Sequence, residues 1–276
     1  MADENDDLMV VGDEIIGGVQ ERPKSLSRDD LSGTEDIGAD DVRLPRLAIA
    51  QGLSPEMTPG DARHIEDLKM FEFFNDLTGD RYGQGPLSFV PVRRDVRRIE
   101  FTPREEGGGV VDMDVPPGDP RLKFTKGPGG ERIPPRATTF TEFVVLLLRK
   151  GQQPEPIVLS IKETNKFNRR ASGNMNTFIK LRNAAIYSGL YTVSSKPEKN
   201  DKGTFGTYVV KNAGFLNIDQ PSGAKLHAYA KKFAESLEGK QIVVNRDTSM
   251  HDAESDTDFD TERMDREAAG GTAPQM

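Results

Sequence analysis

The chain has 276 residues, of which 35% are hydrophobic and 30% charged, and it contains no cysteine. The absence of cysteine excludes disulfides, thiolate metal sites and a cysteine nucleophile, and it is typical of a reducing compartment such as the cytoplasm, where we expect the protein. The longest apolar run, FVVLLL at 143–148, has the length of a strand. It is far shorter than the ~20 residues of a membrane helix, so we expect no membrane partner.

Charge divides the chain into three parts. Residues 1–42 hold 13 acidic and 3 basic residues, and residues 247–276 hold 9 and 2, whereas residues 43–246 hold 23 acidic and 32 basic residues. All but one of the Phe and Tyr residues also lie within 43–246. Charged segments with almost no aromatic residues cannot bury enough apolar surface to offset the entropy of ordering. We therefore predict a basic folded body at 43–246 between two disordered acidic arms.

The first half of this body predicts extended structure. Order is expected from Leu44, because the three prolines that follow it before residue 60 disfavour a long helix. Residues 86–101 (PLSFVPVRRDVRRIEF) alternate apolar and polar residues with one irregularity near Pro91, which predicts a strand with a bulge. Residues 103–136 are rich in Gly and Pro and predict a long loop.

The second half predicts strands with two helices. The ranges expected to be strands are 138–149, 156–162, 190–195, 204–211 and 241–245. One helix is expected over 174–188, capped by Asn174 or Asn176, and a second over 222–239, where apolar residues recur at helical spacing. The fold class is therefore a β-rich α+β protein, built as a small barrel or as a curved antiparallel sheet with two helices.

Motifs for catalysis and metal binding are absent from the sequence. No His-x-x-x-His pair, P-loop ending or Gly-x-Ser-x-Gly elbow occurs. The tail acids at 256, 258 and 260 are spaced as in a calcium loop, but Thr261 occupies the position where that loop needs glycine. We therefore expect a protein that is not an enzyme and that holds no cofactor or metal.

Basic residues accompany aromatic residues in three stretches of the body. Cations that follow a backbone, with flat rings on which bases stack, are the recognition chemistry of single-stranded nucleic acid. A solvated charged surface is the alternative for each stretch taken alone. The candidate contacts are Lys162, Lys166, Phe167, Arg169, Arg170, Lys180 and Arg182 in the densest stretch, Arg94 and Arg97 among four arginines at 93–98, and Lys199, Lys202, Phe205 and Tyr208 in the predicted hairpin. Phe89, Phe101 and Phe178 have apolar periodicity and are predicted to lie in the core.

Four segments of the body, taken in order, resemble single-stranded DNA-binding proteins of tailed bacteriophages. They are RLPRLAIAQGLSPEM, GPLSFVPVRR, PIVLSIKETNKFNRRASGNMNTFIKL and YTVSSKPEKNDKGTFGTYVV, and the resemblance extends over Arg43 to Asn245. It implies an OB-like barrel and a role in replication or recombination in the host cytoplasm. Some members of that family carry cysteine pairs in the central loop; this chain has none, so we expect no metal-stapled loop.

The acidic arms suggest regulation. A tethered acidic segment can compete with nucleic acid for a cationic groove and can present a docking segment to replication or recombination proteins. In the second arm the candidate docking residues are Phe259 with Asp256, Asp258 and Asp260. We expect single-stranded DNA as the ligand, with RNA as a further candidate because stacking and phosphate contacts scarcely distinguish the two sugars. The protein could form a homo-oligomer. Two alternative functions also remain open: a phage structural or assembly protein with acidic interaction arms, and a metal-dependent nuclease.

Overall fold

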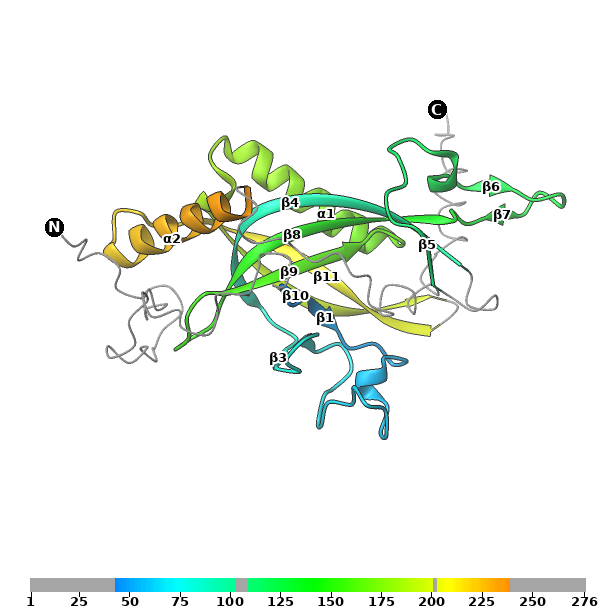
Figure 1. Cartoon of the computed structure of the whole chain (residues 1–276), viewed down its shortest axis with the longest axis horizontal. Helices are drawn as coiled ribbons and strands as arrows, with labels where there is room; N and C mark the ends of the chain where they lie inside the picture. Colours follow the sequence, from blue (N-terminus) through cyan, green and yellow to red (C-terminus); the bar gives the residue numbers. More distant parts are fainter. Residues whose placement is uncertain (1–42, 103–108, 201–202, 239–276) are drawn as a thin grey trace, which may run out of the picture.

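A curved antiparallel sheet of six strands organises the part of the chain that the computed structural model describes, residues 43–102, 109–200 and 203–238 (Figure 1). Five strands lie side by side in the order β11-β10-β4-β8-β9, and β5 pairs with the end of β4. The strands are β4 (Leu87–Phe101), β5 (Val110–Asp112), β8 (Ala137–Leu148), β9 (Glu155–Lys162), β10 (Gly189–Asn200) and β11 (Gly203–Phe215). The sheet and the two helices described below confirm the predicted β-rich α+β class.

The connections of the sheet follow a Greek key. β4, β8 and β9 form a meander, and the helix α1 (Lys166–Arg182) then leads to β10, which returns to lie beside β4. The spatial order of fourth, first, second and third strand defines this motif. β11 adds a fifth strand, as in the partly open five-stranded barrels of the OB type. Within the described residues β9 and β11 remain the two edges of the sheet, so this is a curved sheet and not a closed barrel.

The predicted irregularity in the first long strand is present in β4. The register with β8 shifts between Pro91 and Arg93. Proline cannot donate a hydrogen bond to the ladder, and an extra residue at such a point bends a strand. β4 pairs with β10 only near its start, at Leu87 to Phe89, and with β8 along most of its length. The alternating pattern was therefore sufficient to predict both the strand and its break.

Both faces of the sheet are covered by apolar packing. On one face, Phe89 and Phe143 belong to a cluster with Met175 of α1. On the other, Val90 and Leu146 pack against the helix α2 (Pro221–Glu238), which confirms the helix predicted over 222–239. This double covering explains why β8 is buried along almost its whole length and why its second half, residues 143–148, is a continuous apolar run. Among the described helices, none combines the length and the apolar character needed to cross a membrane.

A small three-stranded sheet and α1 both reach from one edge of the large sheet to the other. The small sheet consists of β1 (Leu47–Ile49), β2 (Phe73–Asn75) and β3 (Arg81–Gly83). Ahead of β1, the carbonyl of Pro45 accepts a hydrogen bond from Val158 N on β9 at 2.8 Å, and after β1 the Oε1 of Gln51 accepts from Gly206 N on β11 at 2.8 Å. A Cβ on Gly206 would lie 2.7 Å from Ile49, so this close approach requires glycine. α1 likewise contacts β9 and β11.

The first helix begins earlier than its sequence pattern predicted. Asn165 caps it, with its Oδ1 accepting hydrogen bonds from the N–H groups of Phe167 and Asn168. It ends at Asn183, which adopts the left-handed conformation at φ 51°. The prediction over 174–188 was wrong because it took later asparagines as the cap and Gly189 as the end. The basic segment 166–170 is therefore helical and lies on the first turns of α1.

Two loop predictions also need correction. The described part of the Gly/Pro-rich loop 103–136 contains β5, a short hairpin of β6 (Thr125–Lys126) and β7 (Arg132–Ile133), and a 3-10 turn at Pro120–Leu122. The hairpin β10–β11 is longer than predicted, because pairing extends to Asn200 and Gly203. The predicted arms 1–42 and 247–276 and the predicted strand 241–245 lie outside the described residues.

Candidate nucleic-acid interface

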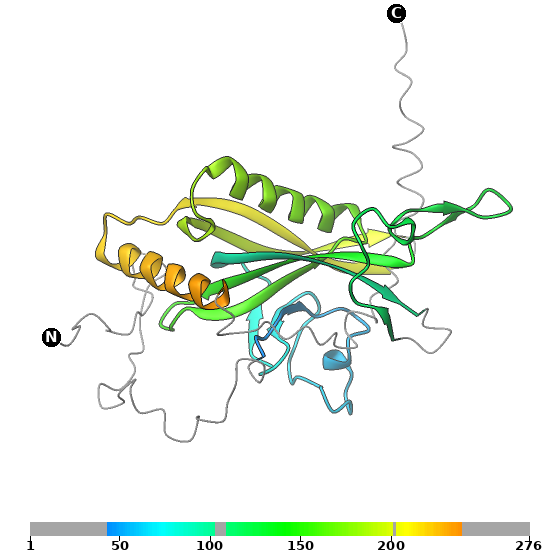
Figure 2. The ribbon, with the colours of Figure 1, turned by 45° about the horizontal axis from the view of Figure 1, so that its top comes forward.

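Several segments that are distant in sequence meet at one end of the large sheet. The ends of β4 and β9, the start of β8, the start of α1 and the β6–β7 hairpin lie there, whereas α2 lies toward the other end (Figure 2). In barrels of the OB type, the loops at this position, between the first two and the last two strands, flank the ligand. We call this region the basic end and define it by Arg98, Lys123, Arg132, Lys166, Arg169 and Arg170.

The start of α1 supplies the densest positive charge of the basic end. Arg169 and Arg170 are exposed, and Lys166 is half-buried with its Nζ 5.1 Å from the ring centroid of Phe167. The first turn contains no acidic residue. Since the first N–H groups of a helix have no intrahelical acceptor, the helix itself adds positive potential at this end. The arrangement is suited to an anion.

A cavity of about 450 Å³ lies between this helix start and the loop. Its polar and aromatic lining includes Lys123, Phe124, Arg132, Thr139, Thr164 and Arg169. The Cζ of Arg132 lies 3.9 Å from the ring centroid of Phe124, which places the guanidinium over the ring. The one carboxylate of the lining, Glu163, accepts hydrogen bonds from Thr141 and Ser172 at 2.6 and 2.7 Å.

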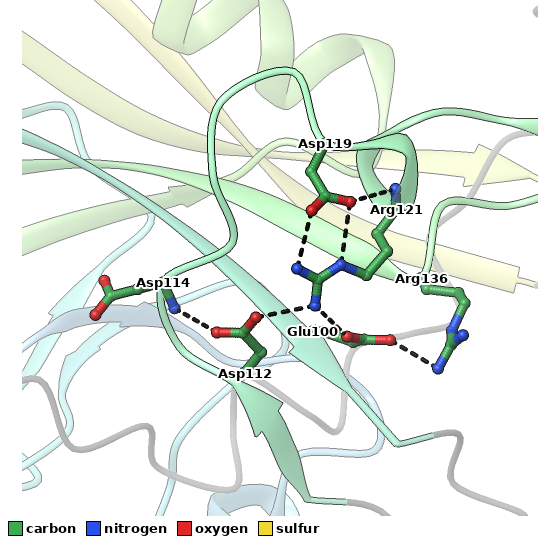
Figure 3. Close-up of polar contacts among 6 residues, drawn as sticks. All are labelled: Glu100, Asp112, Asp114, Asp119, Arg121 and Arg136. Carbon is green, nitrogen blue, oxygen red and sulfur yellow. Dashed lines mark hydrogen bonds and ion pairs between the residues drawn. The ribbon is translucent and has the colours of Figure 1, made fainter.

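The loop that forms one wall of the cavity is held by Arg121 (Figure 3). Its guanidinium contacts Glu100, Asp112 and Asp119 at 2.7 to 2.9 Å, and Glu100 also pairs with Arg136 at 2.8 Å. A hydrogen bond from the backbone of Asp114 and the contact with Arg121 lower the pKa of Asp112. Hydrogen bonds from Arg121 lower the pKa of Asp119 and, with those to Glu100 and Asp112, raise the pKa of Arg121. Two arginines thus face three carboxylates, so this cluster holds the loop in place and keeps one net negative charge beside the basic end.

The second predicted cluster is divided between the two faces of the sheet. Arg94 is exposed and donates from Nε to Asn176 Oδ1 of α1 at 2.6 Å, so it joins the face on which α1 lies. Arg98, which is part of the basic end, lies opposite Thr139 in the ladder. Arg97 is on the other face, where it forms a buried ion pair with Glu142 at 2.5 Å. Arg97 therefore offers little surface to a ligand.

Three other predicted cations differ in their surroundings. Lys162 is 8% exposed, with its Nζ 5.7 Å from the ring centroid of Phe101. Arg182 donates to the carbonyl of Gly214 and to Asn212 Oδ1, and it therefore connects α1 to β11. Lys180 is exposed, but it lies fourteen residues after Lys166, about 21 Å along the helix axis. Lys162 is at the basic end, as the last residue of β9, but it is buried, whereas Lys180 and Arg182 lie near the far end of α1.

The hairpin residues of the third cluster are mostly part of the packing. Phe205 is only 7% exposed, so it offers little ring surface to a base; it lies in the ladder of β10 and β11, opposite Glu198. Tyr208 is half-buried, 6.1 Å from the ring of Phe73. Lys199 is exposed near the tip of the hairpin. Lys202 and the predicted docking residues Phe259, Asp256, Asp258 and Asp260 lie outside the described residues.

The sequence prediction missed the loop contribution to this site. Lys123, Phe124 and Arg132 lie in the segment that was predicted to be a long loop. A signal was present, since the segments KFTK and ERI surround the turn GPGG at 127–130, which is the pattern of a short basic hairpin. Thr164 had no signal, because its position depends on how β9 meets α1.

The fold and the site together define a β-rich α+β protein with a Greek-key sheet and a basic cavity at one end. The chain belongs to the family of Pam3 phage gp34-like proteins, whose model matches residues 17–243. The expectation of a phage protein is therefore confirmed at the level of this family. Neither the curated proteins nor the solved structures contain a match to the chain.

Proposed function

We propose that this protein binds single-stranded DNA at the basic end and acts in phage DNA replication or recombination. The observation that carries the proposal is the convergence of Lys123, Arg132 and Arg169 with the ring of Phe124 around one cavity. Cations for phosphates and a ring for a base are the two parts of single-strand recognition. Their location fits the loop-bordered site of barrels with this connectivity.

The strand would continue from the cavity along α1. Arg169 and Arg170 would contact the phosphates next to the cavity. Arg94 of β4 would contact the strand further along α1, because it is hydrogen-bonded to Asn176 in the middle of that helix. Each stacked base contributes ~1–3 kcal/mol, and each phosphate contact adds a salt-dependent contribution. The acidic segment 247–276 would compete with DNA for these cations and would present Phe259 to partner proteins.

The experiment is a titration of a fluorescent single-stranded oligonucleotide at several salt concentrations, with duplex as competitor. We expect preference for the single strand and a steep salt dependence. The variant Arg169→Ala/Arg170→Ala should reduce the logarithmic slope by about 0.7 to 1.4, since each phosphate contact on a single strand contributes about 0.7. The matched control is Lys225→Ala/Lys232→Ala, which removes two exposed cations from α2, toward the other end of the sheet.

Three results would count against this proposal. Equal slopes for the two double variants would remove the start of α1 from the interface. Equal affinity for duplex and single strand would reduce the binding to that of any basic surface. If deletion of residues 247–276 leaves the affinity unchanged or weaker, the tail does not compete with DNA.

An assembly protein is the second candidate, and one observation favours it. Leu181, Phe215 and Ile218 are 78%, 61% and 56% exposed where the end of α1 meets the end of β11. Exposed apolar side chains that gather in this way can form a contact between subunits. This candidate predicts large assemblies in light scattering, and their loss on Phe215→Ser, with no single-strand preference. A nuclease would instead cleave the oligonucleotide when magnesium or manganese is added.

A further inference from the structure

The cavity at the basic end has the size and the lining of a site for a small ligand. Its volume of about 450 Å³ falls within the range of about 300–1,000 Å³ that is usual for such sites. It is formed by three separate parts of the chain: the loop around Lys123 to Arg132, the start of β8 at Thr138 and Thr139, and the junction of β9 with α1.

The charges of the lining select an anion. Lys123, Arg132 and Arg169 contribute three positive charges against the single carboxylate of Glu163. Glu163 accepts hydrogen bonds from the hydroxyl groups of Thr141 and Ser172, so it is already partnered within the fold. The start of α1 adds the partial positive charge of its first N–H groups.

A buried hydroxyl is a second, independent sign of a ligand. Thr164 lines the cavity and is 1% exposed, and its Oγ1 has no hydrogen-bond partner in the described part of the chain. The side-chain amide nitrogen of the neighbouring Asn165, a residue that is also 1% exposed, likewise has no hydrogen-bond partner in the described part of the chain. Buried polar groups in folded proteins almost always have partners. A ligand with oxygen atoms in the cavity would supply one to Thr164.

The stacked pair of Phe124 and Arg132 indicates that the anion carries a flat group. Both side chains are half-buried, and the guanidinium lies 3.9 Å from the ring centroid. A guanidinium over a ring keeps N–H groups at its edge, from which a phosphate can accept them in a bidentate manner. The same flat surface can stack with a base.

We infer that the cavity binds one nucleotide unit, with its phosphate between Arg132, Arg169 and Lys123, its base on the Phe124–Arg132 stack and a hydrogen bond to Thr164. This inference rests on the proposed function, because it makes the cavity the place where one nucleotide of the strand leaves the surface and is enclosed. It also goes beyond that function, since a free nucleotide should bind in the same place.

The test uses the full-length protein and dAMP, deoxyadenosine and inorganic phosphate as probes in calorimetric titrations. We expect dAMP to bind about tenfold more tightly than either deoxyadenosine or phosphate, because only dAMP engages both the cations and the stack. Arg132→Gln should weaken dAMP about tenfold, as the loss of one charge-assisted contact does. The matched control is Lys126→Gln, an exposed cation of the same hairpin that does not line the cavity.

A second variant separates the cavity from the surrounding charge. Thr164→Val keeps the shape of the side chain, removes the hydroxyl and leaves every charge in place. It should weaken dAMP several-fold without changing the salt dependence, and a thermal melt of the same sample checks that it is folded. Equal losses in Arg132→Gln and Lys126→Gln, or full dAMP affinity in folded Thr164→Val, would show that the nucleotide does not occupy this cavity.

The probes also separate this inference from the proposed function. Equal affinity for phosphate and dAMP would overturn the nucleotide assignment and leave an anion site. If the oligonucleotide binds with single-strand preference but dAMP does not bind, the inference fails and the proposed function stands. If dAMP binds as expected and the oligonucleotide shows no single-strand preference, the cavity assignment stands and the proposed function fails.

Discussion

Arg97 belongs to a residue type that commonly binds nucleic acid, but here it stabilises the fold through a buried ion pair with Glu142. The pair is 2.5 Å apart with side chains 3% and 7% exposed, and Ser160 Oγ donates to the same Glu142 oxygen at 3.1 Å. Arg97→Ala should lower the free energy of unfolding by roughly 3–5 kcal/mol, because it leaves a buried carboxylate without its cation. Urea denaturation measures the change.

The control for this prediction replaces both members of the pair. Arg97→Met/Glu142→Leu should recover most of the stability, since a buried ion pair contributes little beyond well-packed apolar side chains of similar volume. Oligonucleotide affinity should remain unchanged in the double variant. A loss of affinity with intact stability would bring Arg97 back into the interface.

At the residue level, the sequence could not separate cations that face solvent from those that stabilise the packing. Lys162, Arg182 and Arg169 occur in one basic stretch, yet their surroundings differ. Lys162 is buried near aromatic rings, Arg182 is hydrogen-bonded to β11, and Arg169 is exposed. The difference depends on which neighbours the fold supplies from distant segments. The prediction for Phe205 fails for the same reason, because its burial depends on the neighbours that the fold supplies and not on the polar residues next to it in the sequence.

At the scale of elements, the loop between β4 and β8 should respond to acid. The pKa values of Asp112 and Asp119 are lowered from 3.8 in the folded loop. A carboxylate with a lowered pKa adds stability that is complete above its unfolded pKa and is lost as pH falls through its folded pKa. The loop should therefore be unchanged between pH 5 and 8 and loosen only below about pH 4.

Backbone amide shifts measured by NMR can test this. The amides of Asp114 and Arg121 donate to Asp112 and Asp119 at 3.0 and 2.8 Å, so each reports one carboxylate. Both should titrate with midpoints below 3.8, and Arg121→Gln should move both midpoints upward. Midpoints at or above 3.8 in the unmodified protein would mean that Arg121 does not hold the loop.

Element types were predictable here to the extent that they are local. β4, β8 and β9 follow from alternation and apolar runs, and α2 from helical spacing. The start of α1 was missed because several asparagines compete for the cap, and only Asn165, which is buried where β9 ends, forms it. The β6–β7 hairpin was missed because two-residue strands carry almost no periodic signal.

At the scale of the whole molecule, the loop that carries half of the cavity is an insertion between paired strands. Glu100 and Ala137 are directly opposite in the ladder of β4 and β8. Replacement of residues 102–136 by a short Asn-Gly turn should therefore leave the sheet folded, since such a turn suits a tight hairpin. The shortened protein should lose dAMP binding and keep weaker oligonucleotide binding through Arg169 and Arg170.

Circular dichroism and urea unfolding check the fold of the shortened protein, and the titrations described above check binding. Loss of cooperative unfolding would show that the insertion belongs to the core. Retention of full dAMP affinity would place the nucleotide outside the cavity. The whole-molecule arrangement was the least predictable level, because the cavity requires the insertion, β8 and α1 to meet and no local pattern encodes that meeting.

α1 extends across both edges of the large sheet, with Met175 inside the packing and Arg169 on the outside. Binding and folding stability are therefore thermodynamically linked. A polymer that binds α1 only in the folded protein would raise the apparent free energy of unfolding by mass action. Conversely, a substitution that destabilises α1 would weaken binding of the polymer even where the substituted residue does not contact the polymer. Natural selection for tight binding of the polymer and selection for a stable core would thus act on the same seventeen residues of α1.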